Sequence, residues 1–510
     1  MYAKYINKMS KTEVITILKQ IDMTKWQYNS DNDVYWQVGI SYCANPVNKT
    51  YEILGLYVPG AYFNETENGD GTYTCEINEN SAVGNYTAKT APIVFPVNTP
   101  GYSAMVAPTS YTDVSTYTHQ GFVYMYAGCR GRDAGVPAGV TDLKAAVRYI
   151  RYNKNIIPGS MERIFSFGMS GGGAQSALMG TTGDSDLYTP YLEEIGAVSG
   201  VSDSIIGSMC WCPITNLDVA DAAYEWNLGS ARSDLDDDTQ KLSNGLAEEF
   251  AKYINKLGLK DENGKELVLE KSDSGIYQSG TYYNYIKSTI EKSLSDFLSD
   301  TQFQSQNSVS ASFSRGFAAV QDYIDSLNSE NQWINYDSKT NTVAITSVSD
   351  FVKACKTPWK SVGAFDNLDK SVIENVLFGY GDGNGAHFDA MEAELLAGTD
   401  YETDFIEDFK KTDLHGNTVD TRVNMYNPMY YLCDYYDGNG SSNIAKYFRI
   451  RTGIQQGDTA LCTEVDLALA LKAKGTDVDF ETVWGQAHVK AERIGDSDTN
   501  FIEWVNECLK

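Results

Sequence analysis

Short apolar runs, each bounded by glycine, proline or polar residues, recur through the first two hundred residues. They are YEILGLYV (51–58), APIVFPV (91–97), GFVYMYAG (121–128) and RIFSFGM (163–169). Runs of this length and composition predict the buried strands of a sheet. The segment 140–154 has apolar residues at helical spacing over a basic outer face, which predicts a helix between the third and fourth strands. Strand, helix and strand in succession predict a parallel sheet.

The pattern changes between residues 203 and 430. This stretch is polar, acidic and rich in helix-forming segments, with few strand-like runs. After it the alternation resumes with KYFRIRTG (446–453), ALCTEVDLALALKAKG (460–475) and DVDFETVWG (477–485), followed by a last helix, NFIEWVNECLK. We therefore expect an α/β domain in two parts, 1–202 and 431–510, and a large, mainly helical inserted domain at 203–430.

The composition fits this picture and narrows the range of partners. Hydrophobic residues make up 42% of the 510 residues and charged residues 21%, which excludes wholesale disorder and a coiled coil. The net charge of -28 disfavours binding to nucleic acid or to anionic membrane surfaces. No stretch reaches the roughly 18 apolar residues of a membrane helix, and MYAKYINKMSKTEV lacks the apolar core of a signal peptide. A leader already removed would leave the same sequence, so the compartment stays open between cytoplasmic and secreted.

The nine cysteines are an odd number and are widely spaced, so they do not form a disulfide framework. Cys210 and Cys212 flank Trp211 without the second cysteine or histidine pair that a zinc site needs nearby. We expect small core residues at most of these positions, and neither a structural metal nor a cofactor.

The sequence G-M-S-G-G at 168–172 is the clearest candidate for chemistry. It follows the predicted strand RIFSF directly and precedes a plausible helix, GGGAQSALMG. This context is typical of the nucleophile elbow of an α/β-hydrolase fold, in which Ser170 stands at the apex and the Gly171 N–H faces a developing oxyanion. The alternative is a Gly/Ser loop met by chance, since a bare G-x-S-x-G is common. The flanking strand and helix favour the nucleophile.

A nucleophilic serine needs a base, and the chain has four histidines, at 119, 387, 415 and 488. In an α/β hydrolase the base follows the last strand, and His488 follows DVDFETVWG, so we expect His488 to be the base. His387, in GDGNGAHFD of the insertion, is expected to be a solvated loop residue, with a place at the pocket rim as the alternative. His119 and His415 are expected to be structural.

Two further positions follow from chain order in this fold. The acid of the triad follows the penultimate strand, where Asp458 is the carboxylate of RTGIQQGDTALC. We expect Asp458 to orient His488, and the alternative is a helix cap. A second oxyanion donor is expected from NTPGY (98–102), where Gly101 permits close backbone approach, with an ordinary Pro-Gly turn as the alternative.

Several longer segments resemble the bacterial tannases, or tannin acyl hydrolases, which are serine esterases of the α/β-hydrolase fold with a large inserted lid domain. They are TAPIVFPVNTPGY, AGCRGR, DLKAAVRYIRYNKNIIPGSMERI, GMSGGGAQSALMG and CPITNLDVADAAYEW. The stretch from about 230 to 350 carries little that matches. The cysteines that flank nucleophile and base in fungal tannases and feruloyl esterases are not found beside Ser170 and His488, so the resemblance is to the bacterial type.

The resemblance also implies a substrate site in the lid. The segment KSVGAFDNLDKSVIENVLFG is similar to the family segment in which a lysine and a glutamate hold the phenolic hydroxyls of a galloyl ring, here Lys360 and Glu374. The family has two aspartates in the acid loop, the first to orient the histidine and the second to bind a phenolic hydroxyl. Gln456 stands at the first position and Asp458 at the second. Asp458 is therefore expected to serve as acid, ring ligand or both.

The expected function is that of a serine carboxylesterase on a small phenolic acid ester, galloyl esters foremost, working through an acyl-enzyme on Ser170. One alternative keeps this chemistry with a hydroxycinnamoyl (feruloyl) or small aliphatic acyl group. Another is a degenerate hydrolase that binds an aromatic ligand with little turnover, because Gln456 replaces a carboxylate.

Overall fold

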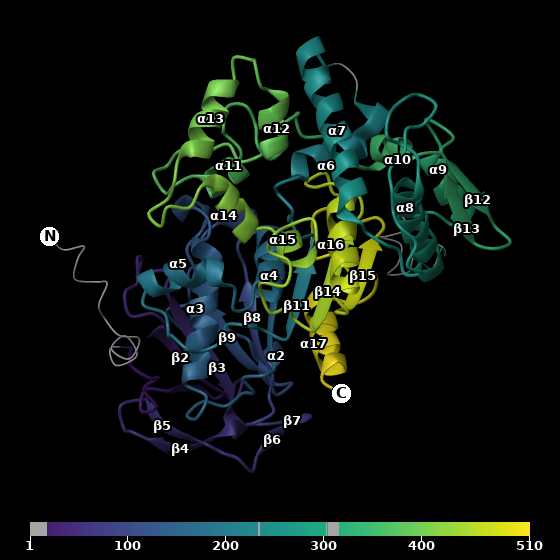
Figure 1. The fold of residues 1–510 in the computed structure, drawn as a ribbon. Helices are drawn as coiled ribbons and strands as arrows, with labels where there is room; N and C mark the ends of the chain where they lie inside the picture. Colours follow the sequence, from purple (N-terminus) through teal and green to yellow (C-terminus); the bar gives the residue numbers. More distant parts are fainter. Residues whose placement is uncertain (1–17, 233–234, 302, 304–315) are drawn as a thin grey trace.

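A nine-stranded sheet forms the centre of the protein (Figure 1). The computed structural model describes residues 18–232, 235–301, 303 and 316–510. In sheet order the strands are β1 (Gln27–Asn29), β2 (Val34–Ser41), β3 (Ile53–Pro59), β9 (Val123–Ala127), β8 (Ile93–Val97), β10 (Ile164–Met169), β11 (Gly207–Trp211), β14 (Tyr447–Gly453) and β15 (Asp477–Val483). The strands from β9 to β15 run parallel, and β1, β2 and β3 add antiparallel neighbours at one edge.

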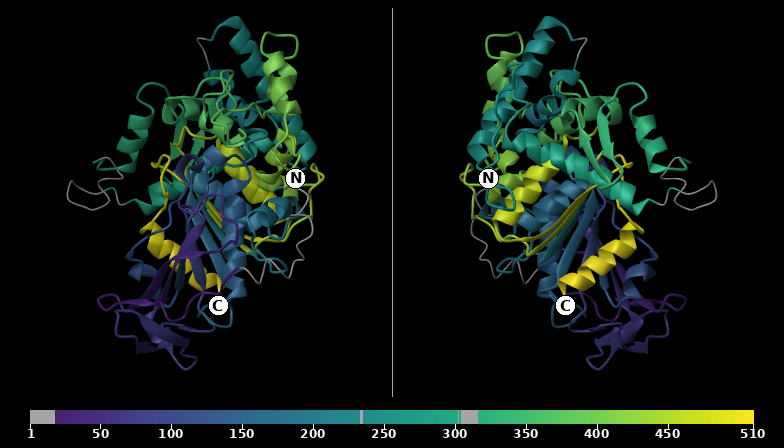
Figure 2. Two further views of the ribbon diagram at one scale, coloured as in Figure 1. Left: turned by 90° about the vertical axis from the view of Figure 1, so that its left-hand side faces the viewer. Right: turned by 90° about the vertical axis from the view of Figure 1, so that its right-hand side faces the viewer.

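Helices cover both faces of this sheet. One face carries α3 (Ala138–Tyr152), α4 (Gly171–Thr181), α5 (Thr189–Glu194), α15 (Pro428–Leu432) and α16 (Leu461–Ala473), and the other carries α2 (Ser115–Thr118) and α17 (Ser497–Cys508). Figure 2 shows α16 and α17, both yellow, on opposite sides of the strands. The Phe501 ring of α17 packs 4.6 Å from the Phe167 ring of β10. On the opposite face α4 lies so close to β14 that a Cβ at Gly180 would come within 2.5 Å of the Phe448 ring.

The inserted segment lies beyond one end of the sheet, and two small hairpins lie at the other end (Figure 1). The insertion contains α6 (Ala220–Leu228), α7 (Asp237–Leu257), α8 (Thr281–Asp300), α9 (Val320–Leu327), β12 (Ile334–Asp337), β13 (Thr342–Ile345), α10 (Val348–Cys355), α11 (Ile373–Phe378), α12 (Ala390–Leu395), α13 (Glu402–Lys410) and α14 (Val419–Met425). The hairpins are β4 (Phe63–Glu67) with β5 (Tyr73–Ile77), and β6 (Ala82–Val83) with β7 (Tyr86–Thr87).

Helix α7 illustrates why the insertion is helical. Asp236 caps its first turn by accepting a hydrogen bond from the Thr239 N–H, and Gly258 ends it in the left-handed conformation. Leu246, Phe250 and Ile254 recur at helical spacing and are buried. The polar residues between them face solvent, so this sequence is amphipathic at the helical period and buries one face on the rest of the insertion.

The α/β-hydrolase architecture predicted from the sequence is confirmed. Each predicted strand and each predicted helix of the two hydrolase parts is present, with ends shifted by a few residues. One difference concerns the insertion. Residues 207–211 form β11 in the middle of the sheet, although they fall within the range 203–430 assigned to the inserted domain. This short strand, GSMCW, follows a polar stretch and lacks the long apolar run that marks the other strands.

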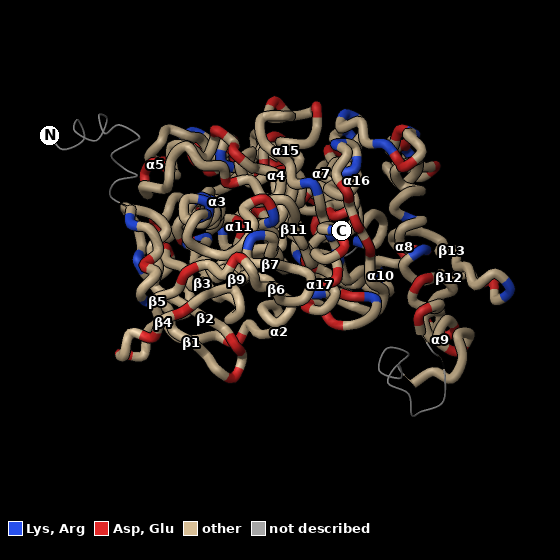
Figure 3. The backbone as a smooth tube through the Cα atoms, turned by 90° about the horizontal axis from the view of Figure 1, so that it is seen from below, with Lys and Arg blue, Asp and Glu red and all other residues tan. Residues whose placement is uncertain are grey.

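Charged residues are spread over the whole surface. Figure 3 shows acidic and basic positions interspersed along all parts of the chain seen from below. Within the described residues, no helix is long and apolar enough to cross a membrane. The segment MYAKYINKMSKTEV, on which the expectation about a signal peptide rests, lies outside the described residues.

Candidate active site

Ser170 occupies a sharp turn between β10 and α4. Its φ of 61° and ψ of -127° lie in a region that non-glycine residues rarely adopt, and its N–H donates to the Trp211 carbonyl at 2.9 Å. A Cβ at Gly172 would collide with the backbone of Val97 at the end of β8, so this position requires glycine. The turn therefore presents the serine at the ends of three adjacent strands, as the elbow motif predicts.

His488 lies on the loop after β15, and its Nε2 is 2.8 Å from the Ser170 Oγ. Its Nδ1 is 2.6 Å from the Gln456 Oε1. Since that oxygen only accepts, Nδ1 carries the proton, and Nε2 presents a lone pair to the serine hydroxyl. The structure thus joins the predicted nucleophile and the predicted base by a hydrogen bond with the proton acceptor facing the serine.

The residue that orients the histidine differs from the sequence expectation. Asp458 was expected in this role, yet its Oδ2 is 3.7 Å from the His488 Nδ1, beyond hydrogen-bond length, and its side chain is 46% exposed. Gln456, two residues earlier in the loop after β14, is buried and makes the contact instead. Asp458 still acts through space, because its charge raises the pKa of His488.

Glu464 lies directly behind Gln456. The Gln456 Nε2 donates to the Glu464 Oε1 at 2.6 Å and to the Thr452 Oγ1 at 2.7 Å. Thr452 also donates to Glu464, at 3.1 Å. Burial raises the pKa of the Glu464 carboxyl to about 7, although the charge of the buried Lys356 opposes this shift. These contacts fix the amide so that its oxygen, and not its nitrogen, faces the imidazole.

Cys212 links the loops that carry the base and its partner. Its Sγ lies 3.2 Å from the Val489 carbonyl and 3.5 Å from the Gly453 N–H, and its φ is 43°. The sequence pattern predicts only a small core residue here. Tyr224 makes a similar link, since its hydroxyl donates to the Gly457 carbonyl at 2.9 Å and accepts from the Lys360 N–H at 3.0 Å. No local motif marks either residue, because each contact joins distant parts of the chain.

The two predicted oxyanion donors lie side by side. A Cβ at Gly171 would come within 2.5 Å of the Tyr102 nitrogen, so the start of α4 abuts the turn that contains Gly101. Among the described residues, neither the Gly171 N–H nor the Gly101 N–H has a hydrogen-bond acceptor. Gly101 has a φ of 53°, and its carbonyl accepts from the Arg132 Nη1 at 2.6 Å. Arg132 thus fixes the turn.

Lys360 and Glu374, from two segments of the insertion, approach this site. The Lys360 Nζ lies 4.0 Å from the centre of the Phe365 ring, and its charge lowers the pKa of His488. Glu374 is buried in the first turn of α11, next to Ile373, which lies against Gly101. Burial and the charge of Asp458 raise the pKa of Glu374, whereas the charge of Lys360 lowers it. All three predicted ring-binding groups therefore interact electrostatically near Ser170 and His488.

The other histidines lie elsewhere. His387 was expected to be solvated, but it is fully buried, stacks on Phe405 at 3.7 Å and bonds through Nδ1 to Asp366 at 2.7 Å. The packing of α13 over the loop explains the difference. His119 bonds to the Asn32 carbonyl at 3.0 Å and His415 to Glu194 at 2.8 Å, which are structural contacts as expected.

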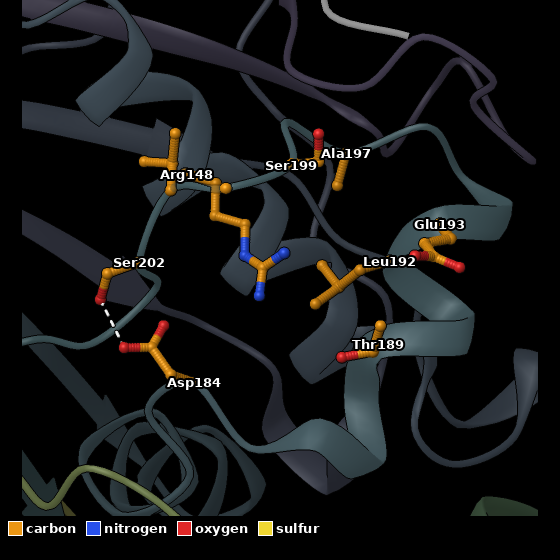
Figure 4. Close-up of a pocket in the computed structure, with 10 residues that line it drawn as sticks. Arg148, Asp184, Thr189, Leu192, Glu193, Ala197, Ser199 and Ser202 are labelled. Carbon is orange, nitrogen blue, oxygen red and sulfur yellow. Dashed lines mark hydrogen bonds between the residues drawn. The ribbon is translucent and has the colours of Figure 1, made fainter. Parts of the chain in front are cut away.

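A surface cavity of about 330 Å³ lies apart from these residues (Figure 4). It is lined by Arg148, Asp184 and neighbours on α5, and contains neither Ser170 nor His488. Asp184 accepts from Ser202 at 2.7 Å, and Arg148 pairs with Asp203 at 2.6 Å. Asp184 and Arg148 are thus committed to structural partners, and we assign no chemistry to this cavity.

Comparisons with known proteins agree with the fold. A family model described as BD-FAE matches residues 87–230, which include β8, β9, β10 and the turn at Ser170. The tannase of Fusobacterium nucleatum is 29% identical, with a TM-score of 0.72 over 94% of this chain and 95% of that chain. No protein of curated function matches significantly.

Two further solved structures were crystallised with phenolic ligands. A tannin acyl hydrolase in complex with ethyl gallate is 28% identical, with a TM-score of 0.71 over 94% of each chain. Another, in complex with 3,4-dihydroxybenzoate, is 27% identical, with a TM-score of 0.73 over 97% of this chain and 99% of that one. The resemblance to bacterial tannases is therefore confirmed over nearly the whole chain, which is tannase-like and of the ester-hydrolase class.

Proposed function

We propose that the protein is a serine carboxylesterase that hydrolyses esters of phenolic acids, galloyl esters foremost. The observation that carries the proposal is the 2.8 Å contact between the Ser170 Oγ and the His488 Nε2, made by a serine held in strained backbone geometry. A hydroxyl aimed at a neutral imidazole lone pair is the arrangement that nucleophilic acyl transfer requires.

In the proposed acylation step the Ser170 Oγ attacks the ester carbonyl while His488 Nε2 takes its proton. The N–H groups of Gly171 and Gly101 stabilise the oxyanion that forms. His488 then gives the proton to the leaving alkoxide, which releases the alcohol and leaves the acyl group on Ser170. Water, deprotonated by His488, attacks this acyl-enzyme, and the second tetrahedral intermediate then collapses: the acid leaves and His488 returns the proton to the Ser170 Oγ.

The imidazolium formed in these steps has three sources of stabilisation. The Gln456 carbonyl accepts the Nδ1 hydrogen bond, and the buried Glu464 polarises the Gln456 amide from behind. The Asp458 carboxylate, 3.7 Å away and about half exposed, adds about 1 kcal/mol at a dielectric constant near that of water. We infer that Gln456 is the positioning residue and that Glu464 and Asp458 supply the negative charge that an amide lacks.

A phenolic acyl ring is the substrate group that the lid residues fit best. An ammonium donor at Lys360 and carboxylate acceptors at Glu374 and Asp458 match adjacent phenol hydroxyls, whose donors and acceptors need partners in a buried site. Tannin acyl hydrolases of similar structure bind ethyl gallate and 3,4-dihydroxybenzoate, which carry such hydroxyls. The ligands of these relatives support the same class of ring here.

Rapid mixing with p-nitrophenyl acetate tests the mechanism. The proposal expects a burst of p-nitrophenol close to one equivalent of enzyme when deacylation is slower than acylation, and a trapped acyl group on Ser170 by mass spectrometry at low pH. Steady-state rates with methyl gallate, methyl ferulate and methyl butyrate then identify the acyl preference. A protein that binds gallate but never acylates would instead be the degenerate hydrolase suggested by Gln456.

A further inference from the structure

We propose that Asp221, Asp389 and Glu392 bind a divalent cation of the calcium type between α6 and α12 of the inserted segment. One oxygen of each carboxylate lies within 4.8 Å of an oxygen of each of the others, and all three side chains are buried. Asp221 comes from the first turn of α6, while Asp389 caps α12 and Glu392 follows in that helix. The site is distinct from the proposed esterase chemistry.

Unpartnered oxygens point to a ligand. Among the described residues, neither Glu392 oxygen nor the Asp389 Oδ2 has a hydrogen-bond partner, although Glu392 and Asp389 are fully buried. A buried carboxylate without a partner is strongly unfavourable unless something compensates for the lost hydration. The described lysines and arginines form no ion pair with these three acids.

The neighbouring Asp366, in contrast, has hydrogen-bond donors for both of its carboxylate oxygens. Asp366 accepts from His387 Nδ1 at 2.7 Å, from the Asn375 side chain at 2.7 Å and from the N–H groups of Phe388 and Asp389 at 2.6 and 2.8 Å. These four donors occupy its oxygens. Asp366 is therefore a structural residue beside the cation site, and the unpartnered oxygens belong to Asp389 and Glu392.

The chemistry of the three ligands favours calcium. All of them are hard carboxylate oxygens, which calcium and magnesium prefer. Calcium accepts about six to eight oxygen ligands in a flexible geometry, whereas magnesium demands a near-ideal octahedron and keeps several waters. Three buried carboxylates whose oxygens lie within 4.8 Å of one another therefore suit calcium better than magnesium. Burial raises the pKa of Asp221 to about 7 and the pKa values of Asp389 and Glu392 well above their usual range, and a bound cation would oppose these shifts.

The cation would hold the loop that carries Lys360 to α6. The Asp221 carboxylate accepts from the N–H groups of Phe365 and Asp366 at 2.9 and 3.0 Å. The Phe365 ring supports the Lys360 ammonium, and Asn375, next to Glu374, donates to Asp366. An ion at Asp221 thus fixes the loop and the helix that carry both lid groups.

Calcium binding to the full chain tests the proposal. Protein treated with EDTA and then dialysed is titrated with CaCl₂ while Tm and sensitised Tb³⁺ emission are followed. The expected results are one bound ion and a Tm increase of about 2–3 °C at a free calcium concentration one hundred times Kd. MgCl₂ is expected to give a smaller shift. Stripped protein with no response to calcium or Tb³⁺ in either measurement would overturn the site.

Two substitutions in α12 provide the matched comparison. Glu392→Gln keeps the shape of the side chain and removes its charge, and is expected to weaken calcium binding at least tenfold. Glu394→Gln removes the same charge from an exposed position of the same helix and is expected to bind like the unmodified protein. Should Glu392→Gln fail to fold, Asp389→Asn, which retains a capping oxygen, takes its place. Equal calcium affinity in all variants would also contradict the proposal.

Discussion

The Gln456 side chain accepts a 2.6 Å hydrogen bond from the Nδ1 of His488, in the place where a serine triad ordinarily has a carboxylate. The amide is neutral, yet its nitrogen contacts the buried Glu464 at 2.6 Å. The Glu464 carboxyl group therefore lies behind the amide, one side chain away from the imidazole. This relationship suggests distinct outcomes for substitutions at the two positions.

Removing the nucleophile should abolish hydrolysis without unfolding the protein. We expect Ser170→Ala to lower kcat by at least about 10⁴-fold on every ester, because no other group can form the acyl-enzyme. The melting temperature should change by no more than a few degrees, since the Oγ contributes little to the core. Burst kinetics and a thermal melt check both statements, and substantial turnover by this variant would disprove the mechanism.

Removing the positioning amide should affect all substrates alike. Gln456→Leu is expected to lower kcat by about 10²–10⁴-fold on methyl gallate and p-nitrophenyl acetate, because His488 loses its tautomeric and orientational control. Asp458→Asn should lower kcat on p-nitrophenyl acetate by less than about tenfold, since Asp458 lies beyond hydrogen-bond length. The reverse order of these two effects would show that Asp458 is the true partner of the histidine.

Exchanging the two side chains should return the charge to the imidazole. In Gln456→Glu/Glu464→Gln the new carboxylate accepts from His488 Nδ1 while the amide at position 464 donates to it. We expect kcat to rise about tenfold above that of the unmodified enzyme, because the imidazolium gains a direct charged acceptor. Gln456→Glu alone should be less active, since two buried carboxylates in contact repel and one takes up a proton. A double variant whose kcat is no higher than that of Gln456→Glu would contradict the proposed role of Glu464 behind Gln456.

The pH dependence of kcat/KM reports the environment of His488. Burial lowers the pKa of its imidazole below the usual 6.5, so the base stays neutral, and active, at more acidic pH. With p-nitrophenyl acetate the acidic limb should have its midpoint below pH 6.5. Asp458→Asn should move the midpoint lower still, because the aspartate raises this pKa, and Lys360→Met should move it higher, because the lysine lowers it. Shifts of the same sign would rule out this electrostatic account.

The lid groups should matter only for phenolic substrates. Lys360→Ala and Glu374→Gln are each expected to raise KM for methyl gallate about 5- to 100-fold, which corresponds to one or two lost charged hydrogen bonds. KM for p-nitrophenyl acetate should change by less than about twofold, because its acyl group has no phenol. Comparable losses on both esters would indicate a structural role for these residues.

The sequence by itself determined the architecture and identified the serine and the histidine that the structure joins by a hydrogen bond. Strand and helix periodicity is local, so the predicted elements of the hydrolase parts are present, and Ser170 and His488 follow from their places at strand ends. It missed β11 within the insertion because Gly207 and Ser208 interrupt the apolar run that marks the other strands. Chain order alone located the acid loop but could not choose between Gln456 and Asp458, two residues apart on irregular backbone.

Only the tertiary structure decided which side chains meet. The direction of a side chain on an irregular loop depends on what packs around it, and Gln456 is directed by Glu464 from the following helix. Likewise His387 is buried because a separate helix brings Phe405 over it. Asp221 and Glu392 are 171 positions apart in the chain and come together because α6 and α12 lie close together within the insertion. Such contacts depend on long-range packing, for which no local pattern exists.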